Sequence, residues 1–216
     1  MFDCQDMYFK GVENLKFVIL IMILSLAFNV AGQTAQTAAG LAPRQTAGLA
    51  PRQAENSKPN IPAIGKEAPT FSLPDLQQKY VALRDFCGPK LNKPWINKTK
   101  QVVVLSFFAT YCIPCLKEIP HLEKLESNFN GQPVKFLLVN VGEEEAKIKE
   151  FLSGNSVKLD ILHDRYSKIA EKYDALSLPR LYVIDKEGIV RKEQKGFSDP
   201  EQFEVDLTRL LNDLLK

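Results

Sequence analysis

The chain is poor in the residues that build disulfide scaffolds and metal centres. Its 216 residues include only four cysteines, two histidines and one tryptophan. Four cysteines are too few for a disulfide-rich scaffold. The two histidines, His121 and His163, are 42 residues apart, so the chain lacks the His-x(3–5)-His half of a zinc site. These shortages disfavour a small disulfide-stapled domain and a zinc-finger type of site.

Excess charge and long apolar runs are also scarce. The formal net charge is +2, and no basic patch is interleaved with aromatic residues, so nucleic acid is not an expected partner. The one extended apolar run, residues 15–30, is interrupted by Lys16, Ser25 and Asn29. It is therefore short for a membrane-spanning helix, which needs about 20 mostly apolar residues.

The apolar run has the features of a secretory signal. Lys10 and Lys16 precede it, and the small residues Val30-Ala31-Gly32 follow it where a signal peptidase could cut. Residues 1–32 are therefore predicted to be a signal peptide or, alternatively, a retained N-terminal membrane anchor. Either form places the remaining chain outside the cytoplasm, in the periplasm or at the outer face of the inner membrane, secreted or tethered.

A low-complexity segment follows at residues 33–63. It contains a near-exact tandem repeat, residues 37–45 and 46–53, dominated by Ala, Gly, Pro, Thr and Gln. This composition buries too little apolar surface to offset the entropy of ordering, and two copies are fewer than the roughly three that a solenoid needs. The segment is predicted to be a disordered spacer.

Residues 64–216 have the composition of one globular domain of ordinary size. The apolar patterns predict a hairpin of strands near residues 71–73 and 80–83, buried strands at 102–108, 134–141 and 181–184, a returning strand from 189, and helices at 113–129, 143–152, 164–173 and 200–215. Helix-linked strands imply a parallel core with helices on both faces, and the last hairpin adds an antiparallel edge. The expected fold class is α/β, with three α/β/α layers, a mixed central sheet and an N-terminal β-hairpin.

The pair Cys112 and Cys115 is predicted to carry the chemistry. In Cys112-Ile-Pro-Cys115, Cys112 stands where a buried strand ends and a helix begins, and unpaired N–H groups and the helix dipole stabilise a thiolate there. Cys115 lies one turn later on the apolar stripe, so it is expected to be buried and within disulfide reach. Pro114 stiffens the loop at little cost.

Cys112 is therefore the predicted nucleophile and Cys115 the resolving thiol, with no cofactor beyond their redox-active disulfide and no metal. The alternatives, half a zinc site and a structural disulfide, fit the strand-to-helix context less well. Cys4 precedes the apolar run. Cys87 is preferred as a semi-buried free thiol over a third redox cysteine or an intermolecular disulfide.

The stretch Val103–Pro120 resembles the active-site region of the thioredoxin superfamily, most closely its exported TlpA/ResA-like thiol–disulfide reductases (redoxins). The resemblance extends over about residues 64–216, with further matches at 65–69 and 185–188. It implies a thioredoxin-like fold and a protein disulfide oxidoreductase, more a reductase than an oxidase.

The resemblance also implies roles for several side chains. Pro179, after Leu178, matches the family's cis-proline, which faces the cysteine pair and helps to bind the substrate backbone. Glu118 matches an acid that tunes the cysteines, although a solvated helix acid is the competing interpretation. Pro114 lies between the cysteines, and Tyr111 replaces the usual tryptophan while retaining an aromatic cover.

Two departures from the family pattern affect these expectations. Ser106 stands where thioredoxin has a buried aspartate, which favours the exported branch. Arg180 stands where threonine is usual, so that a long cation either lies beside the predicted substrate groove or points into solvent.

The expected partners are protein thiols and disulfides, with apocytochrome c among the candidates, and an upstream membrane or soluble thiol donor. The chain is expected to be a monomer. A peroxiredoxin is one alternative, but it needs Pro-x-x-x-Thr-x-x-Cys, and Thr110 stands only two residues before Cys112. A copper chaperone is another, but it needs Cys-x-x-x-Cys, which is one residue longer than the spacing here.

Overall fold

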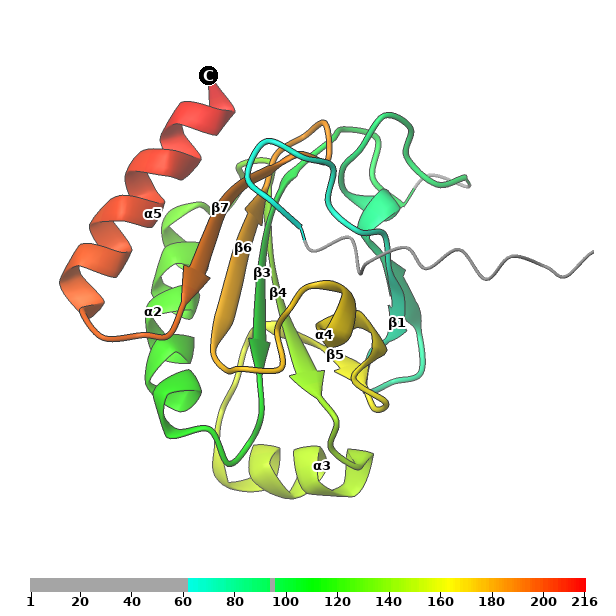
Figure 1. Cartoon of the computed structure of the whole chain (residues 1–216), viewed down its shortest axis with the longest axis vertical. Coiled ribbons are helices and arrows are strands. Elements are labelled where there is room, and N and C mark those ends of the chain that lie inside the picture. Colours follow the sequence, from blue (N-terminus) through cyan, green and yellow to red (C-terminus); the bar gives the residue numbers. More distant parts are fainter. Residues whose placement is uncertain (1–61, 94–95) are drawn as a thin grey trace, which may run out of the picture. The chain divides into compact units, whose positions relative to one another are not determined.

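The computed structural model describes residues 62–93 and 96–216 (Figure 1). The predicted signal or anchor and nearly all of the predicted spacer lie outside these residues. The elements are β1 (Ser72–Pro74), β2 (Tyr80–Ala82), η1 (Leu83–Asp85), β3 (Val102–Phe108), α2 (Ile113–Asn128), β4 (Val134–Val141), α3 (Glu145–Gly154), β5 (Asp160–Asp164), α4 (Lys168–Lys172), β6 (Arg180–Ile184), β7 (Val190–Lys195) and α5 (Pro200–Leu215). No helix in this part of the chain is both long and apolar enough to cross a bilayer.

The central sheet has five strands in the order β5-β4-β3-β6-β7. Strand β3 pairs in parallel with β4, and β4 in parallel with β5, whereas β6 and β7 run antiparallel to their neighbours. Every residue of β3 is buried because the strand is central and both sheet faces are covered. β1 and β2 form a separate antiparallel hairpin. The predicted mixed sheet and N-terminal hairpin are confirmed.

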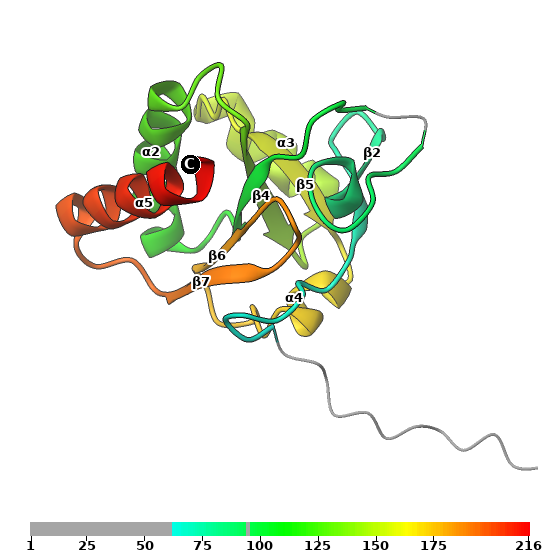
Figure 2. The same cartoon turned by 90° about the horizontal axis from the view of Figure 1, so that it is seen from above.

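Two layers cover the sheet (Figure 2). Alternate residues of β3 point to opposite faces, as the strand period requires. Val102, Val104 and Phe108 pack in a cluster with residues of α2 and α5, including Ile119, Leu122, Phe203 and Leu207. Val103, Leu105 and Phe107 pack in a second cluster with η1, α4 and the hairpin, including Leu83, Tyr173 and Leu73. The three-layer arrangement is thus as predicted.

Two predicted helices begin at the wrong residue. The helix expected from Glu143 begins at Glu145, and the helix expected over 164–173 consists only of α4. The residues before α4 include strand β5, which the sequence pattern did not reveal. β5 reads Asp-Ile-Leu-His-Asp, so its apolar run is too short to predict a strand, and its pairing with β4 decides its conformation.

Helix α5 begins where the sequence predicts. The Asp199 carboxylate accepts a hydrogen bond from the backbone N–H of Gln202 at 3.0 Å, and Pro200 occupies the first turn. An acidic N-cap followed by proline is a favoured start because it satisfies or removes unpaired N–H groups.

Candidate functional site

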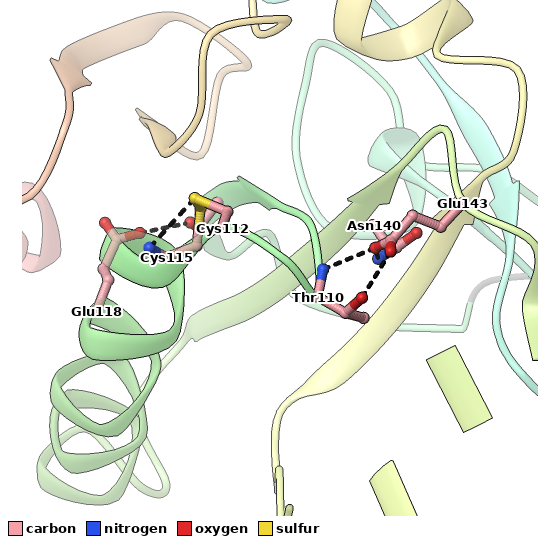
Figure 3. Close-up of a disulfide and its surroundings, with 7 residues drawn as sticks. Thr110, Cys112, Cys115, Glu118, Asn140 and Glu143 are labelled. Atoms are coloured by element: carbon pink, nitrogen blue, oxygen red, sulfur yellow. Dashed lines mark hydrogen bonds between the residues drawn. A yellow bond between two sulfur atoms is a disulfide. The ribbon is translucent and has the colours of Figure 1, made fainter. Parts of the chain in front are cut away.

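The cysteine pair lies in the turn that joins β3 to α2 (Figure 3). Cys112 is the N-cap of α2, and it forms a disulfide with Cys115 across a Cα–Cα distance of 5.2 Å. Cys115 is 0% exposed, whereas Cys112 is 9% exposed. The predicted positions of both residues are confirmed, and Cys112 is the member of the pair with access to solvent.

The start of the helix favours negative charge on Cys112. The backbone N–H of Cys115 donates to the Cys112 Sγ atom at 3.3 Å, and Pro114 lies in the first helical turn, where it removes one donor without a lost helical bond. The helix dipole adds a partial positive charge at this end. Together these groups stabilise a thiolate on Cys112 relative to its thiol.

Glu118 is buried in the same helix, one turn beyond Cys115. Its side chain is 1% exposed, and its Oε2 atom accepts a hydrogen bond from the Ser106 hydroxyl at 3.0 Å. Its Oε1 atom has no hydrogen-bond partner among the described residues. Burial raises the pKa of Glu118 from 4.5 to about 7, and the Ser106 hydrogen bond opposes part of that rise. A solvated helix acid is therefore excluded.

The Glu118 carboxyl lies toward the disulfide end of α2 (Figure 3). Its partner Ser106, which the resemblance places at the position of thioredoxin's aspartate, orients the carboxyl through its hydroxyl. The sequence pattern indicated each residue separately, but only the packing of α2 on β3 reveals that they form a pair.

The peptide bond between Leu178 and Pro179 is cis, as the resemblance implies. It lies just before β6, in which Arg180 is paired with Phe107 of β3. The bond is therefore next to the end of β3, from which the cysteine turn starts. Leu178 packs against the cluster that contains both cysteines. The structure thus brings Leu178 and Pro179 to the site.

Arg180 is not exposed, although the sequence suggested a cation either beside the substrate groove or in solvent. Its side chain is almost completely buried, and its guanidinium pairs with Glu193 of β7 and with Asp174 at 3.1 Å. Because two carboxylates hold this cation, the structure does not present it at the surface as a substrate contact.

Large exposed apolar side chains flank Cys112 in the chain, and another precedes the cis-proline. Tyr111 is 74% exposed, and Ile113, on the other side of Cys112 in the chain, is also largely exposed. Leu176, two residues before Leu178, is a third exposed apolar side chain. Tyr111 therefore projects into solvent beside the pair, and the sequence pattern did not indicate the other two residues.

Glu143 is a site residue that sequence reasoning missed. Its carboxylate accepts two hydrogen bonds from Thr110, from the backbone N–H to Oε2 at 2.7 Å and from the hydroxyl to Oε1 at 2.6 Å. Asn140 Nδ2 also donates to Oε2, at 2.7 Å. Glu143 was expected in the first turn of a helix. Its position after a buried parallel strand was the available signal, because the carboxyl ends of parallel strands converge at one sheet edge.

Cys87 is a free thiol, as preferred from the sequence. It is fully buried rather than semi-buried. Burial raises the pKa of Cys87 to about 12. A thiol of this kind is unreactive because its thiolate is scarcely populated.

The model of the AhpC/TSA family matches residues 64–193. The chain belongs to the AhpC/TSA family. It is similar to the thiol–disulfide oxidoreductase ResA of Bacillus thuringiensis subsp. konkukian, with 32% identity over 147 residues that cover 68% of this chain and 78% of the relative.

Solved structures show the same fold. A Chlorobium tepidum protein described as the thiol:disulfide interchange protein DsbE matches with a TM-score of 0.59 and 24% identity, over 69% of this chain and 99% of its own. The exposed lipoprotein thioredoxin of Streptococcus pneumoniae matches with a TM-score of 0.52 and 28% identity, over 65% and 99%. The fold is thioredoxin-like, and the enzyme class is that of the thiol–disulfide oxidoreductases.

These relatives do not favour the peroxiredoxin or copper-chaperone alternatives. Within residues 62–93 and 96–216, no three His, Cys, Asp or Glu side chains gather into a group that could hold a metal ion.

Proposed function

We propose that this protein reduces disulfides of protein substrates outside the cytoplasm through Cys112 and Cys115. The observation that carries the proposal is the asymmetry of the pair. Cys112, at a helix N-terminus, retains 9% exposure, whereas Cys115 is 0% exposed. Exchange needs this division, because one thiolate must meet the substrate and the second must be kept for resolution.

The exchange proceeds in two steps from the reduced pair. The Cys112 thiolate attacks one sulfur of the substrate disulfide, which forms a mixed disulfide and releases the other substrate sulfur as a thiolate. The Cys115 thiolate then attacks the Cys112 sulfur, which releases the second substrate sulfur and closes the 112–115 disulfide. Two electrons pass to the substrate, and its two thiolates take up protons.

Glu118 is proposed as the group that takes the proton of Cys115. A base is most effective when its pKa is close to the working pH, and burial brings the pKa of Glu118 to about 7. Its Oε1 atom, which has no hydrogen-bond partner among the described residues, leaves an acceptor for that proton.

The negative charge of the Glu118 carboxylate supports the reducing direction. A buried carboxylate beside the pair disfavours the thiolates of the reduced state, and strong oxidants of this fold owe their potential to a stabilised reduced state. Equilibration with glutathione tests the direction. A potential near about −270 mV identifies a reductant, and one near about −120 mV would overturn this assignment.

The substrate class is proposed from the surface around Cys112. Tyr111 and Ile113 expose apolar area on either side of Cys112 in the chain, and Leu176 exposes apolar area two residues before Leu178. Such a surface suits a protein disulfide flanked by apolar residues in an extended segment. Apocytochrome c is the candidate that the family resemblance implies. The proposed context is a monomer, secreted or tethered by residues 1–32, that receives electrons from an upstream thiol donor.

Trapping tests the division of roles. Cys115→Ser leaves the first step intact, so it should accumulate a mixed disulfide with insulin or with a disulfide-bonded apocytochrome c. Cys112→Ser should form none and should not reduce insulin. If Cys112→Ser and wild type reduce insulin equally, or if Cys115→Ser forms no adduct, the proposal fails. Rapid peroxide consumption or tight copper binding by the reduced protein would favour the alternatives.

A further inference from the structure

We infer that Glu143 is a positioning residue that holds the Cys112 turn in the geometry that closes the disulfide. The inference rests on the proposed redox role of the cysteine pair. Within the described part of the chain, the hydrogen bonds of Glu143 reach Thr110, Asn140 and His163 and neither sulfur, so it acts through Thr110, two residues before Cys112. Figure 3 shows Glu143 and Asn140 on one side of Thr110 and the cysteines on the other.

Both hydrogen-bond donors of Thr110 are bonded to Glu143. Thr110 gives both its backbone N–H and its hydroxyl to the two carboxylate oxygens of Glu143, at 2.7 and 2.6 Å. Two hydrogen bonds to the two oxygens of one carboxylate fix orientation as well as distance. Within the turn, the Cys112 N–H donates to the Ala109 carbonyl at 3.0 Å. A fixed Thr110 therefore fixes where α2 begins.

The Glu143 side is anchored to the neighbouring strands. Asn140, buried in β4, donates to the carboxylate at 2.7 Å, and His163, buried in β5, donates from Nε2 to the Glu143 carbonyl at 2.7 Å. Gly142 turns the chain just before Glu143 with φ of +72°, and a Cβ atom there would lie 2.8 Å from the Ser167 hydroxyl. The cysteine turn is thus tied to the end of β4, which pairs with β3, and through it to the end of β5, which pairs with β4.

The position of the turn affects a measurable equilibrium. The reduced protein and oxidised glutathione give the protein disulfide and two reduced glutathione molecules, with both thiol protons passing to glutathione. The equilibrium constant rises with the effective concentration of Cys112 beside Cys115, which falls when the turn is free to move. Removing the Glu143 contacts should therefore lower this constant.

The substitution Glu143→Gln separates position from charge. A glutamine can place its carbonyl oxygen at the Oε2 position, where it accepts from the Thr110 N–H and from Asn140. Its NH₂ group then donates to the Thr110 hydroxyl, which has lone pairs to accept. All three hydrogen bonds are retained and only the charge is lost, so this variant is the conservative rescue.

Two other variants complete the series. Thr110→Val removes the hydroxyl contact at nearly constant shape and leaves the backbone contact. Asp85→Ala is the matched control, because Asp85 is also a buried carboxylate that accepts from a backbone N–H, that of Ala82, and from an asparagine amide, that of Asn92. It lies near the start of β3, since Gln101 donates to the Phe86 carbonyl, and hence at the opposite end of β3 from Thr110.

The experiment measures the glutathione equilibrium constant and the melting temperature of the oxidised full chain for each variant. We expect Glu143→Ala to lower the constant by about tenfold and Thr110→Val by about threefold. Glu143→Gln should remain within about twofold of wild type, and Asp85→Ala should melt earlier with an unchanged constant.

Two results would overturn the inference. One is an unchanged constant in Glu143→Ala despite a lower melting temperature, which would leave Glu143 a purely structural role. The other is an equal fall in Glu143→Gln and Glu143→Ala, which would assign the effect to charge. If Glu143→Ala does not fold, an unchanged constant in Thr110→Val refutes it. Because glutathione replaces the protein substrate, failure of the proposed function would show separately, in the insulin and trapping assays.

Discussion

Replacing Glu118 by glutamine should stabilise the oxidised protein, and the gain should depend on pH. The carboxyl is buried and its pKa is raised from 4.5 to about 7, so its ionised form is disfavoured in the folded state. Glutamine has nearly the same shape and can accept the Ser106 hydrogen bond, but it never ionises. The disulfide removes the titration of Cys112 and Cys115 from the comparison.

The sign and size follow from proton linkage. Between pH 4.5 and about 7 the folded wild-type protein holds a proton on Glu118 that the unfolded chain has lost. The stability contributed by Glu118 is therefore fully present below pH 4.5 and is lost as the pH rises through about 7. At about 1.4 kcal/mol per pH unit, the full loss is about 3 kcal/mol.

Urea unfolding of the oxidised wild type and of Glu118→Gln between pH 4 and 9 measures this difference. The free energy of unfolding of the variant should match that of wild type near pH 4 and exceed it by about 3 kcal/mol at pH 8. Parallel curves across this range would refute the reasoning. Ser106→Ala is the control. Because the Ser106 hydrogen bond lowers the pKa of Glu118, the free energy of unfolding of Ser106→Ala should keep falling to a higher pH than that of wild type.

Two further predictions concern the remaining buried groups. Because burial raises the pKa of Cys87 to about 12, about one Cys87 thiol in 10,000 is ionised at pH 8, so a short iodoacetamide pulse should label it only after unfolding. Peptide mass spectrometry checks this, and native labelling at the rate of an exposed cysteine would contradict it. Arg180→Met should lower the free energy of unfolding by about 3 kcal/mol, because it leaves Asp174 and Glu193 without their shared cation, while insulin reduction stays near wild type. Slower exchange at unchanged stability would instead make Arg180 a substrate contact.

The sequence by itself determined the position of the cysteine pair and the layers around it. The run Val102–Phe108 is continuously apolar because β3 is buried on both faces, and this periodicity is local information. The spacing of Cys112 and Cys115 at a strand-to-helix junction likewise fixes their neighbourhood within a single turn of chain. For the same reason the N-cap position of Cys112 and the burial of Cys115 were predictable.

Only the tertiary structure decided which groups distant in the sequence lie around the cysteine pair and how the strands beyond β3 are arranged. β5 is a strand through its pairing with β4, and Glu143 leaves the expected helix because Thr110 and Asn140 offer it three hydrogen bonds. Glu118 is a buried acid rather than a solvated one because α2 packs its face against Ser106 on β3. Contacts between residues far apart in the sequence produce no periodic pattern along the chain. The environments of β5, Glu118 and Glu143 therefore become known only from the packing of the folded protein.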